Sequence, residues 1–138
     1  MTETTATTTT TSAPVKKKKV KRSVPTGQVH ILATFNNTLI TFTDSKGAKL
    51  TGSSAGACGF RGSKKGTAYA AQVATERAGN AVKQQFGTSK VEVFVRGVGL
   101  GRDAAVRTLS ALGIQVESIK DVTGVPHGGV RPRKARRV

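Results

Sequence analysis

With 138 residues, a formal net charge of +16 and a pI near 11.1, the chain has the length of one domain, and we expect a polyanionic partner: nucleic acid, an anionic membrane surface or an acidic protein. Its single cysteine, Cys58, excludes an internal disulfide and fits a reducing compartment, and Cys58, His30 and His127 are too few and too scattered for a structural zinc site. No apolar run approaches membrane-spanning length, and no signal-peptide core is apparent.

Residues 1–26 are expected to form a disordered arm of net charge +5. Residues 1–15 are mostly threonine and have almost no apolar bulk. Residues 16–22, KKKKVKR, are a solvated basic block that favours a nucleic-acid-binding arm. A plain flexible extension, a nuclear localisation signal and a mitochondrial presequence are the alternatives, and the clustered lysines and Glu3 fit the last of these poorly.

The body of the chain, expected over residues 27–124, starts with three predicted strands. VHILATF and TLITFT are β-branched and apolar, and Asn36 and Asn37 separate them as a turn. DSKG, residues 44–47, predicts the next turn, and AKLTGSS a weaker third strand. This pattern indicates an antiparallel meander.

Two helices and two further strands follow a glycine-rich loop. TAYAAQVATERAGNAVKQQFG is predicted helical, with Thr67 as N-cap and Gly87 as terminator, because its small apolar residues recur at helical spacing: Ala71, Ala74, Ala78, Ala81 and Val82. KVEVFVRG alternates as a half-buried strand, RDAAVRTLSALG is a second helix that stops at Gly113, and IQVESIKD is a final strand. The order β-β-β-α-β-α-β predicts an α/β fold with a mixed sheet and two helices packed on it.

The chain ends in an extended basic tail, residues 125–138, VPHGGVRPRKARRV. It holds five cations and no acid, whereas residues 27–126 hold twelve cations against six acids. A segment with two glycines, two prolines and no apolar cluster cannot fold on its own. We therefore expect it to become ordered only against its partner.

The glycine-rich loop FRGSKKGT is the first candidate site. Arg61, Lys64 and Lys65 lie among glycines directly before a helix, where the backbone approaches a phosphate closely and the helix N-terminus attracts anions. An exposed loop with incidental charges is the alternative. The loop is not a P-loop, because the spacing G-x-x-x-x-G-K-[ST] is absent.

RGVGLGRD is the second candidate site, with Arg96 and Arg102 around a strand-to-helix turn. A dinucleotide-binding fingerprint fails here, because its third glycine should stand where Arg102 is. A backbone-phosphate site and a plain tight turn remain equally open. Of the aromatic residues, only Phe60 and Tyr69 flank a basic loop, so we expect phosphate and sugar contacts to exceed base stacking.

No catalytic constellation, cofactor or metal site is expected. The order of elements is similar to that of the ribonuclease H-like fold, whose metal chemistry needs clustered carboxylates, and the first strand carries none. No Ser–His–Asp or Cys–His pairing is convincing either. A nucleotide-binding or nuclease-like enzyme and, from PVKKKKVKR, a nuclear DNA-binding architectural protein are the rival hypotheses.

Four ordered motifs resemble the family of small-subunit ribosomal protein eleven in its bacterial or organellar form: NNTLITFTDSKG, SSAGACGFRGSKKGTAYAAQVA, VRGVGLGRDAAVRTL and IKDVTGVPHGGVRPRKARRV. The likeness runs from about Gln28 to Val138 and leaves out the threonine-rich arm. It implies a ribonuclease H-like domain without catalysis that binds ribosomal RNA in the platform of the small subunit.

The resemblance further implies a place near the cleft where messenger RNA leaves and exit-site transfer RNA passes, beside ribosomal proteins seven and eighteen, in a cytoplasmic ribosome and away from membranes. A bacterial source is favoured over an organelle. The RNA contacts that it implies are Asn36, Asn37, Arg61, Gly62, Ser63, Lys64, Lys65, Arg96, Gly97, Gly99, Gly101, Arg102 and the tail residues His127, Arg131, Arg133, Lys134, Arg136 and Arg137.

Overall fold

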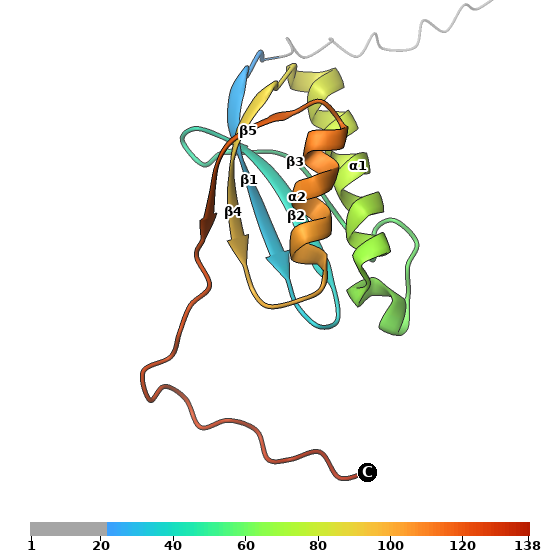
Figure 1. Ribbon diagram of the computed structural model, residues 1–138, viewed down its shortest axis with the longest axis vertical. Coiled ribbons are helices and arrows are strands. Elements are labelled where there is room, and N and C mark those ends of the chain that lie inside the picture. Colours follow the sequence, from blue (N-terminus) through green and yellow to red (C-terminus); the bar gives the residue numbers. More distant parts are fainter. Residues whose placement is uncertain (1–21) are drawn as a thin grey trace, which may run out of the picture.

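The computed structural model describes residues 22–138 and shows a five-stranded mixed sheet that carries two helices on one face (Figure 1). This confirms the predicted α/β fold class and order of strands and helices. The elements are β1 (Thr26–Ala33), β2 (Thr38–Asp44), β3 (Lys49–Ser54), the short 3-10 helix η1 (Gly62–Gly66), α1 (Ala68–Phe86), β4 (Lys90–Arg96), α2 (Gly101–Ala111) and β5 (Gln115–Asp121).

The strands lie in the order β3-β2-β1-β4-β5. β1, β2 and β3 form the antiparallel meander that the sequence predicts, whereas β4 runs parallel to β1, and β5 parallel to β4. The last residues of β1, β4 and β5 therefore meet at one end of the sheet, hereafter the carboxyl end. Because each helix returns the chain between parallel strands, both helices also begin at this end (Figure 1).

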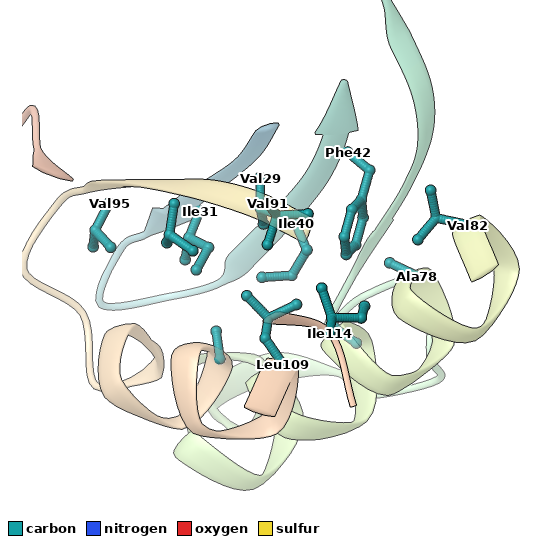
Figure 2. Packing of buried hydrophobic residues seen from close by; sticks show 13 residues of the cluster. Val29, Ile31, Ile40, Phe42, Ala78, Val82, Val91, Val95, Leu109 and Ile114 are labelled. Carbon is teal, nitrogen blue, oxygen red and sulfur yellow. The ribbon is translucent and has the colours of Figure 1, made fainter. Parts of the chain in front are cut away.

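The core lies between the sheet and the helices, because β1, β2 and β4 each turn a row of apolar side chains toward the helices. Alternate side chains of β1, β2 and β4 point at the helices, and alanines of α1 let that helix lie close to the sheet (Figure 2). Phe42 is the largest fully buried side chain, and burying a side chain of this kind stabilises a fold by about 1.5–3 kcal/mol. The buried residues that form this cluster are Val29, Ile31, Ile40, Phe42, Ala74, Ala78, Val82, Val91, Val93, Val95, Ala105, Leu109 and Ile114.

The predicted ends of α1 are confirmed. The Thr67 side chain accepts a hydrogen bond from the Ala70 N–H, and Gly87 takes the left-handed conformation with φ 64°. The loop expected before α1 contains one ordered turn, η1, and Thr67 joins this turn to the helix because its hydroxyl donates to the Lys64 carbonyl over 2.7 Å.

Packing begins a few residues before the boundary expected at residue 27. Val24 is buried and its N–H donates to the Phe86 carbonyl, while Arg22 pairs with Asp44 over 3.1 Å. The expectation of a disordered arm concerns residues 1–21, which lie outside the described residues. At the other terminus, residues 125–138 carry no helix or strand and run away from the body (Figure 1).

Candidate nucleic-acid interface

Three loops and the start of the tail meet at the carboxyl end of the sheet. They are the asparagine turn (residues 34–37), the lysine loop (residues 55–67) and the glycine turn (residues 97–100). The lysine loop touches the asparagine turn so closely that a Cβ on Gly66 would lie 2.2 Å from the Phe35 carbonyl oxygen. The glycine turn touches the end of β1, where the Gly99 N–H donates to the Ala33 carbonyl over 3.0 Å. The body residues predicted to bind RNA thus come from three distant stretches and share one end.

The asparagine turn divides its two asparagines between different tasks. The Asn37 side chain accepts from the Thr38 N–H over 2.9 Å, and the Asn37 N–H donates to the Thr34 hydroxyl over 3.1 Å. Asn37 therefore shapes the turn. Asn36 and Phe35 are exposed, and the exposed fraction of Phe35 is 77%. Asn36 is the asparagine of this turn that faces solvent.

The lysine loop presents amino groups from a fixed backbone. Arg61 folds back and donates to the carbonyls of Gly56, over 2.6 Å, and Phe60, over 3.2 Å. Ser63 and Lys64 are exposed and Lys65 is half-buried, and within residues 22–138 neither lysine pairs with an acid. Arg61 thus holds the loop together, and the two lysines stand before the N-terminus of α1, where an anion is favoured.

The glycines of the glycine turn are explained by close packing against β1. A Cβ on Gly97 would lie 2.1 Å from the Ala33 carbonyl oxygen, one on Gly99 2.3 Å from that of Thr34, and Gly97 also has a φ of 97°. Real side chains do not fit such distances, so these positions need glycine. Gly99 and Gly101 are buried, and the exposed cation beside this turn is Arg96.

Arg102 is bound to the protein itself at the start of α2. Its guanidinium donates to the Gly97 carbonyl and to the Asp121 carboxylate, each over 2.6 Å. Hydrogen bonds from Thr123 and from Arg102 hold the pKa of Asp121 far below its usual range, so this carboxylate is ionised at neutral pH. Arg102 therefore keeps only part of its donor set for a partner.

The tail residues predicted to bind RNA are all exposed. They are His127, Arg131, Arg133, Lys134, Arg136 and Arg137. The tail leaves the end of β5 at the carboxyl end and then extends away from the body (Figure 1). The structure thus places the origin of the tail beside the three loops, and its distant cations apart from them.

Asp121 and Thr123 lie at this end but were not among the predicted site residues. The Asp121 carboxylate accepts from the Thr123 N–H and hydroxyl, over 3.0 Å and 2.6 Å, which is the local pairing that aspartate favours in turns. The signal was the spacing Asp-x-Thr directly after a strand. Tyr69, by contrast, was noted in the sequence, and it lies 65% exposed with its ring edge-on to Phe60 at 5.8 Å.

Among the described residues, 22–138, no helix is long and apolar enough to cross a membrane. That same part of the chain holds no group of three His, Cys, Asp or Glu side chains that would hold a metal ion.

The chain is similar to known proteins over most of its length. The sequence model described as Ribosomal protein S11 matches residues 27–137. The chain is 54% identical over 123 residues to a small ribosomal subunit protein uS11 of Coprothermobacter proteolyticus, covering 89% of this chain and 98% of that protein. It is 52% identical over 122 residues to the protein of the same name from Colwellia psychrerythraea, and 50% identical over 122 residues to that from Borreliella burgdorferi; these matches cover 88% of this chain and 94% and 93% of the relatives.

Proposed function

Because the chain belongs to the ribosomal protein S11 family, a family of structural and non-enzymatic proteins of the small ribosomal subunit, we propose that it binds small-subunit ribosomal RNA in the platform of the subunit. The carboxyl end of its sheet and its tail are the RNA-binding surfaces. RNA bound there belongs to a ribosome in the cytoplasm.

The observation that carries this proposal is the meeting of the three loops at the carboxyl end. Lys64, Lys65 and Arg96 bring three cations to an end where both helices begin, so charged side chains and helix dipoles attract the same phosphates. Ser63 and Asn36 add exposed polar groups that suit phosphate and sugar oxygens.

The other predicted contacts fall into two groups. Arg61, Gly62, Gly97, Gly99, Gly101, Arg102 and Asn37 give the loops their shape, and the guanidinium groups keep donors for phosphate. The tail adds guanidinium forks that pair with phosphates along folded RNA. Its six contacts are His127, Arg131, Arg133, Lys134, Arg136 and Arg137.

The finer position within the subunit is also part of the proposal. The four motifs that resemble the family imply a location near the cleft where messenger RNA leaves and exit-site transfer RNA passes. The same likeness implies ribosomal proteins seven and eighteen as neighbours.

A charge-matched pair of variants tests the RNA-binding surface. Lys64→Ala with Lys65→Ala removes two cations from the carboxyl end. Lys46→Ala with Lys49→Ala removes two from the opposite end of the sheet, one in the turn after β2 and one at the start of β3. For a platform RNA fragment, log K falls as log salt rises. If both lysines of the loop meet phosphates, the first variant makes this fall less steep by about 1.5. The control variant keeps the slope.

Filter binding over a salt series measures these slopes, and circular dichroism checks that both variants keep the fold. Equal losses in the two variants would mean that the RNA senses only net charge and that the lysine loop is ordinary solvated surface. Duplex DNA bound as tightly as the RNA fragment would contradict the ribosomal assignment.

A further inference from the structure

An acid lies at this basic end, where the edge strand β5 stops. Asp121, the last residue of β5, accepts hydrogen bonds from Arg102 and from both the N–H and the hydroxyl of Thr123. The Thr123 hydroxyl in turn accepts from the Gly97 N–H over 3.1 Å, and Arg102 donates to the Gly97 carbonyl. Gly97, Arg102, Asp121 and Thr123 thus form a closed ring of hydrogen bonds, hereafter the clasp.

The clasp joins three parts of the chain that are separate in sequence. Gly97 belongs to the glycine turn, Arg102 to the first turn of α2, and Asp121 is the last residue of β5, which Thr123 follows by two residues. The Val122 N–H makes the last bond of the sheet ladder, to the Val95 carbonyl over 2.9 Å. Beyond Thr123, the described tail makes no hydrogen bond to the body. The clasp is therefore the point from which the tail leaves.

Attraction to a polyanion gives no reason for an acid here, although Asp121 pairs with Arg102 inside the protein. A carboxylate among cations repels a polyanion, and the Asp121 side chain is 51% exposed, so it is not hidden from a partner. Its geometry supplies another reason, because among residues 22–138 no other side chain at this end is bonded both to the start of α2 and to the segment that leads into the tail.

We propose that Asp121 is a positioning residue for RNA binding that acts through the tail. It holds Thr123 against the glycine turn, so that the tail leaves beside Arg96 and Arg102 in one direction. Because the starting point and direction of the tail are then fixed, the tail has fewer conformations before binding, and it loses less conformational entropy when RNA orders it. This inference rests on the proposed RNA-binding function.

The two interpretations of Asp121 predict opposite changes in RNA affinity when the residue is substituted. If Asp121 is only a negative charge near RNA, Asp121→Ala raises RNA affinity. If Asp121 positions the tail, the same substitution lowers affinity by about three- to tenfold, which corresponds to the ordering cost of one or two side chains. Glu117→Gln is the matched control, because Glu117 is exposed on the same strand, and its substitution removes one negative charge without touching the clasp.

The experiment measures the affinity of the full-length protein for a platform RNA fragment at one salt concentration. Asp121→Ala and Thr123→Val should both bind more weakly than the unmodified protein, whereas Glu117→Gln should bind equally or slightly more tightly. Thr123→Val leaves the net charge unchanged, so it tests the clasp even if Asp121→Ala does not fold. Unchanged or tighter binding by a folded Thr123→Val variant would overturn the proposal.

Deleting residues 131–138 distinguishes an effect of Asp121 through the tail from an effect through Arg102. If it acts through the tail, Asp121→Ala costs much less affinity in the deleted protein than in the full chain. An equal loss in both backgrounds would place the effect on Arg102 and overturn the proposal. If Lys64→Ala with Lys65→Ala weakens RNA binding and the clasp variants leave it unchanged, only the role of the clasp is rejected. If the full-length protein does not bind the RNA, the proposed function is rejected.

Discussion

The carboxyl end of the sheet and the tail both carry arginine side chains, but these side chains are bonded to the protein at the carboxyl end and exposed to solvent in the tail. At the carboxyl end, the guanidinium groups of Arg61 and Arg102 donate to carbonyl oxygens of the lysine loop and of the glycine turn. In the tail, Arg131, Arg133 and Arg136 are exposed and their surroundings are solvent. The first surface is shaped by the protein itself, whereas we expect bound RNA to shape the second.

This difference divides the work of binding. A fixed surface loses little conformational entropy on binding, so it favours one geometry of phosphates over another. A free segment loses more entropy, but each of its cations can reach a phosphate and release counterions. We therefore expect the carboxyl end to contribute to both stability and recognition, and the tail to contribute to affinity alone.

The largest expected effect comes from deleting residues 131–138, which removes the five cations of the tail. For the platform RNA fragment, the magnitude of the slope of log K against log salt should decrease by roughly 3 to 5, because each lost phosphate contact removes about 0.7–0.9. The thermal midpoint should stay the same, since the tail does not pack on the body. An unchanged slope would remove the tail from the binding surface, and a lower midpoint would break the division between the two regions.

Gly99→Ala tests whether the carboxyl end is held by close packing. Its Cβ would lie 2.3 Å from the Thr34 carbonyl oxygen, so backbone has to move, and the free energy of unfolding should fall by about 1–3 kcal/mol. Gly124→Ala is the control, because a Cβ there meets nothing within 4 Å. Urea denaturation measures both. Equal stability of the two variants would mean that the glycine turn is as loose as the tail.

Thr67→Ala removes the cap of α1 and the bond from Thr67 to the Lys64 carbonyl. Losing an N-cap costs about 1 kcal/mol in the free energy of unfolding. Because the same hydroxyl fixes the lysine loop, RNA affinity should fall as well, and a titration of the RNA fragment checks this. A variant that loses stability but keeps full RNA affinity would show that the loop binds without being held.

The smallest effect concerns Asp44, at the end of the sheet remote from the proposed RNA surface. The N–H of Ala48 lowers its pKa most, followed by that of Lys46 and the Arg22 guanidinium, against an opposing contribution from burial. A folded-state pKa below the ordinary 3.8 gives stability that is present above about pH 4 and lost as pH falls. Asp44→Asn should thus lower stability at pH 7 and weaken its acid dependence between about pH 5 and pH 3.

The same variant sharpens the comparison between regions, because RNA affinity at neutral pH should not change. Denaturation at several pH values provides the first measurement, and RNA titration provides the second. A clear loss of RNA affinity in the folded Asp44→Asn protein would show that binding extends to the other end of the sheet.

Sequence patterns predicted much of this fold because the patterns are local. Thr67 and Gly87 bound α1 as expected, and the alternation of Val91, Val93 and Val95 marked a half-buried strand. The basic loop before α1 was also visible, since Lys64 and Lys65 are adjacent in sequence. These signals depend on neighbours a few residues apart.

The internal bonds of the site could not be predicted, because they join residues that are distant in sequence. Arg102 and Asp121 are 19 residues apart, and Gly97 and Thr123 are 26 residues apart. The glycines of RGVGLGRD suggested a ligand as much as a turn, and the structure adds that they pack closely against Ala33, Thr34 and Thr38. The uncovered face of the sheet gives a similar case: the ring of Phe94 stacks on His30 at 5.1 Å and lies 5.4 Å from the Lys120 amino group, an arrangement set by the register of three strands.

The direction of β1 relative to β5 has a consequence for the molecule as a whole. Arg22 precedes the start of β1, and the tail follows the end of β5, so the two points lie at opposite ends of the sheet. The eight residues of β1 span about 26 Å, whereas salt at physiological strength screens charges beyond about 8 Å. The two cationic terminal segments therefore join the body at points that are farther apart than the screening length. Their mutual repulsion is screened at these points, which helps one small domain to tolerate a net charge of +16.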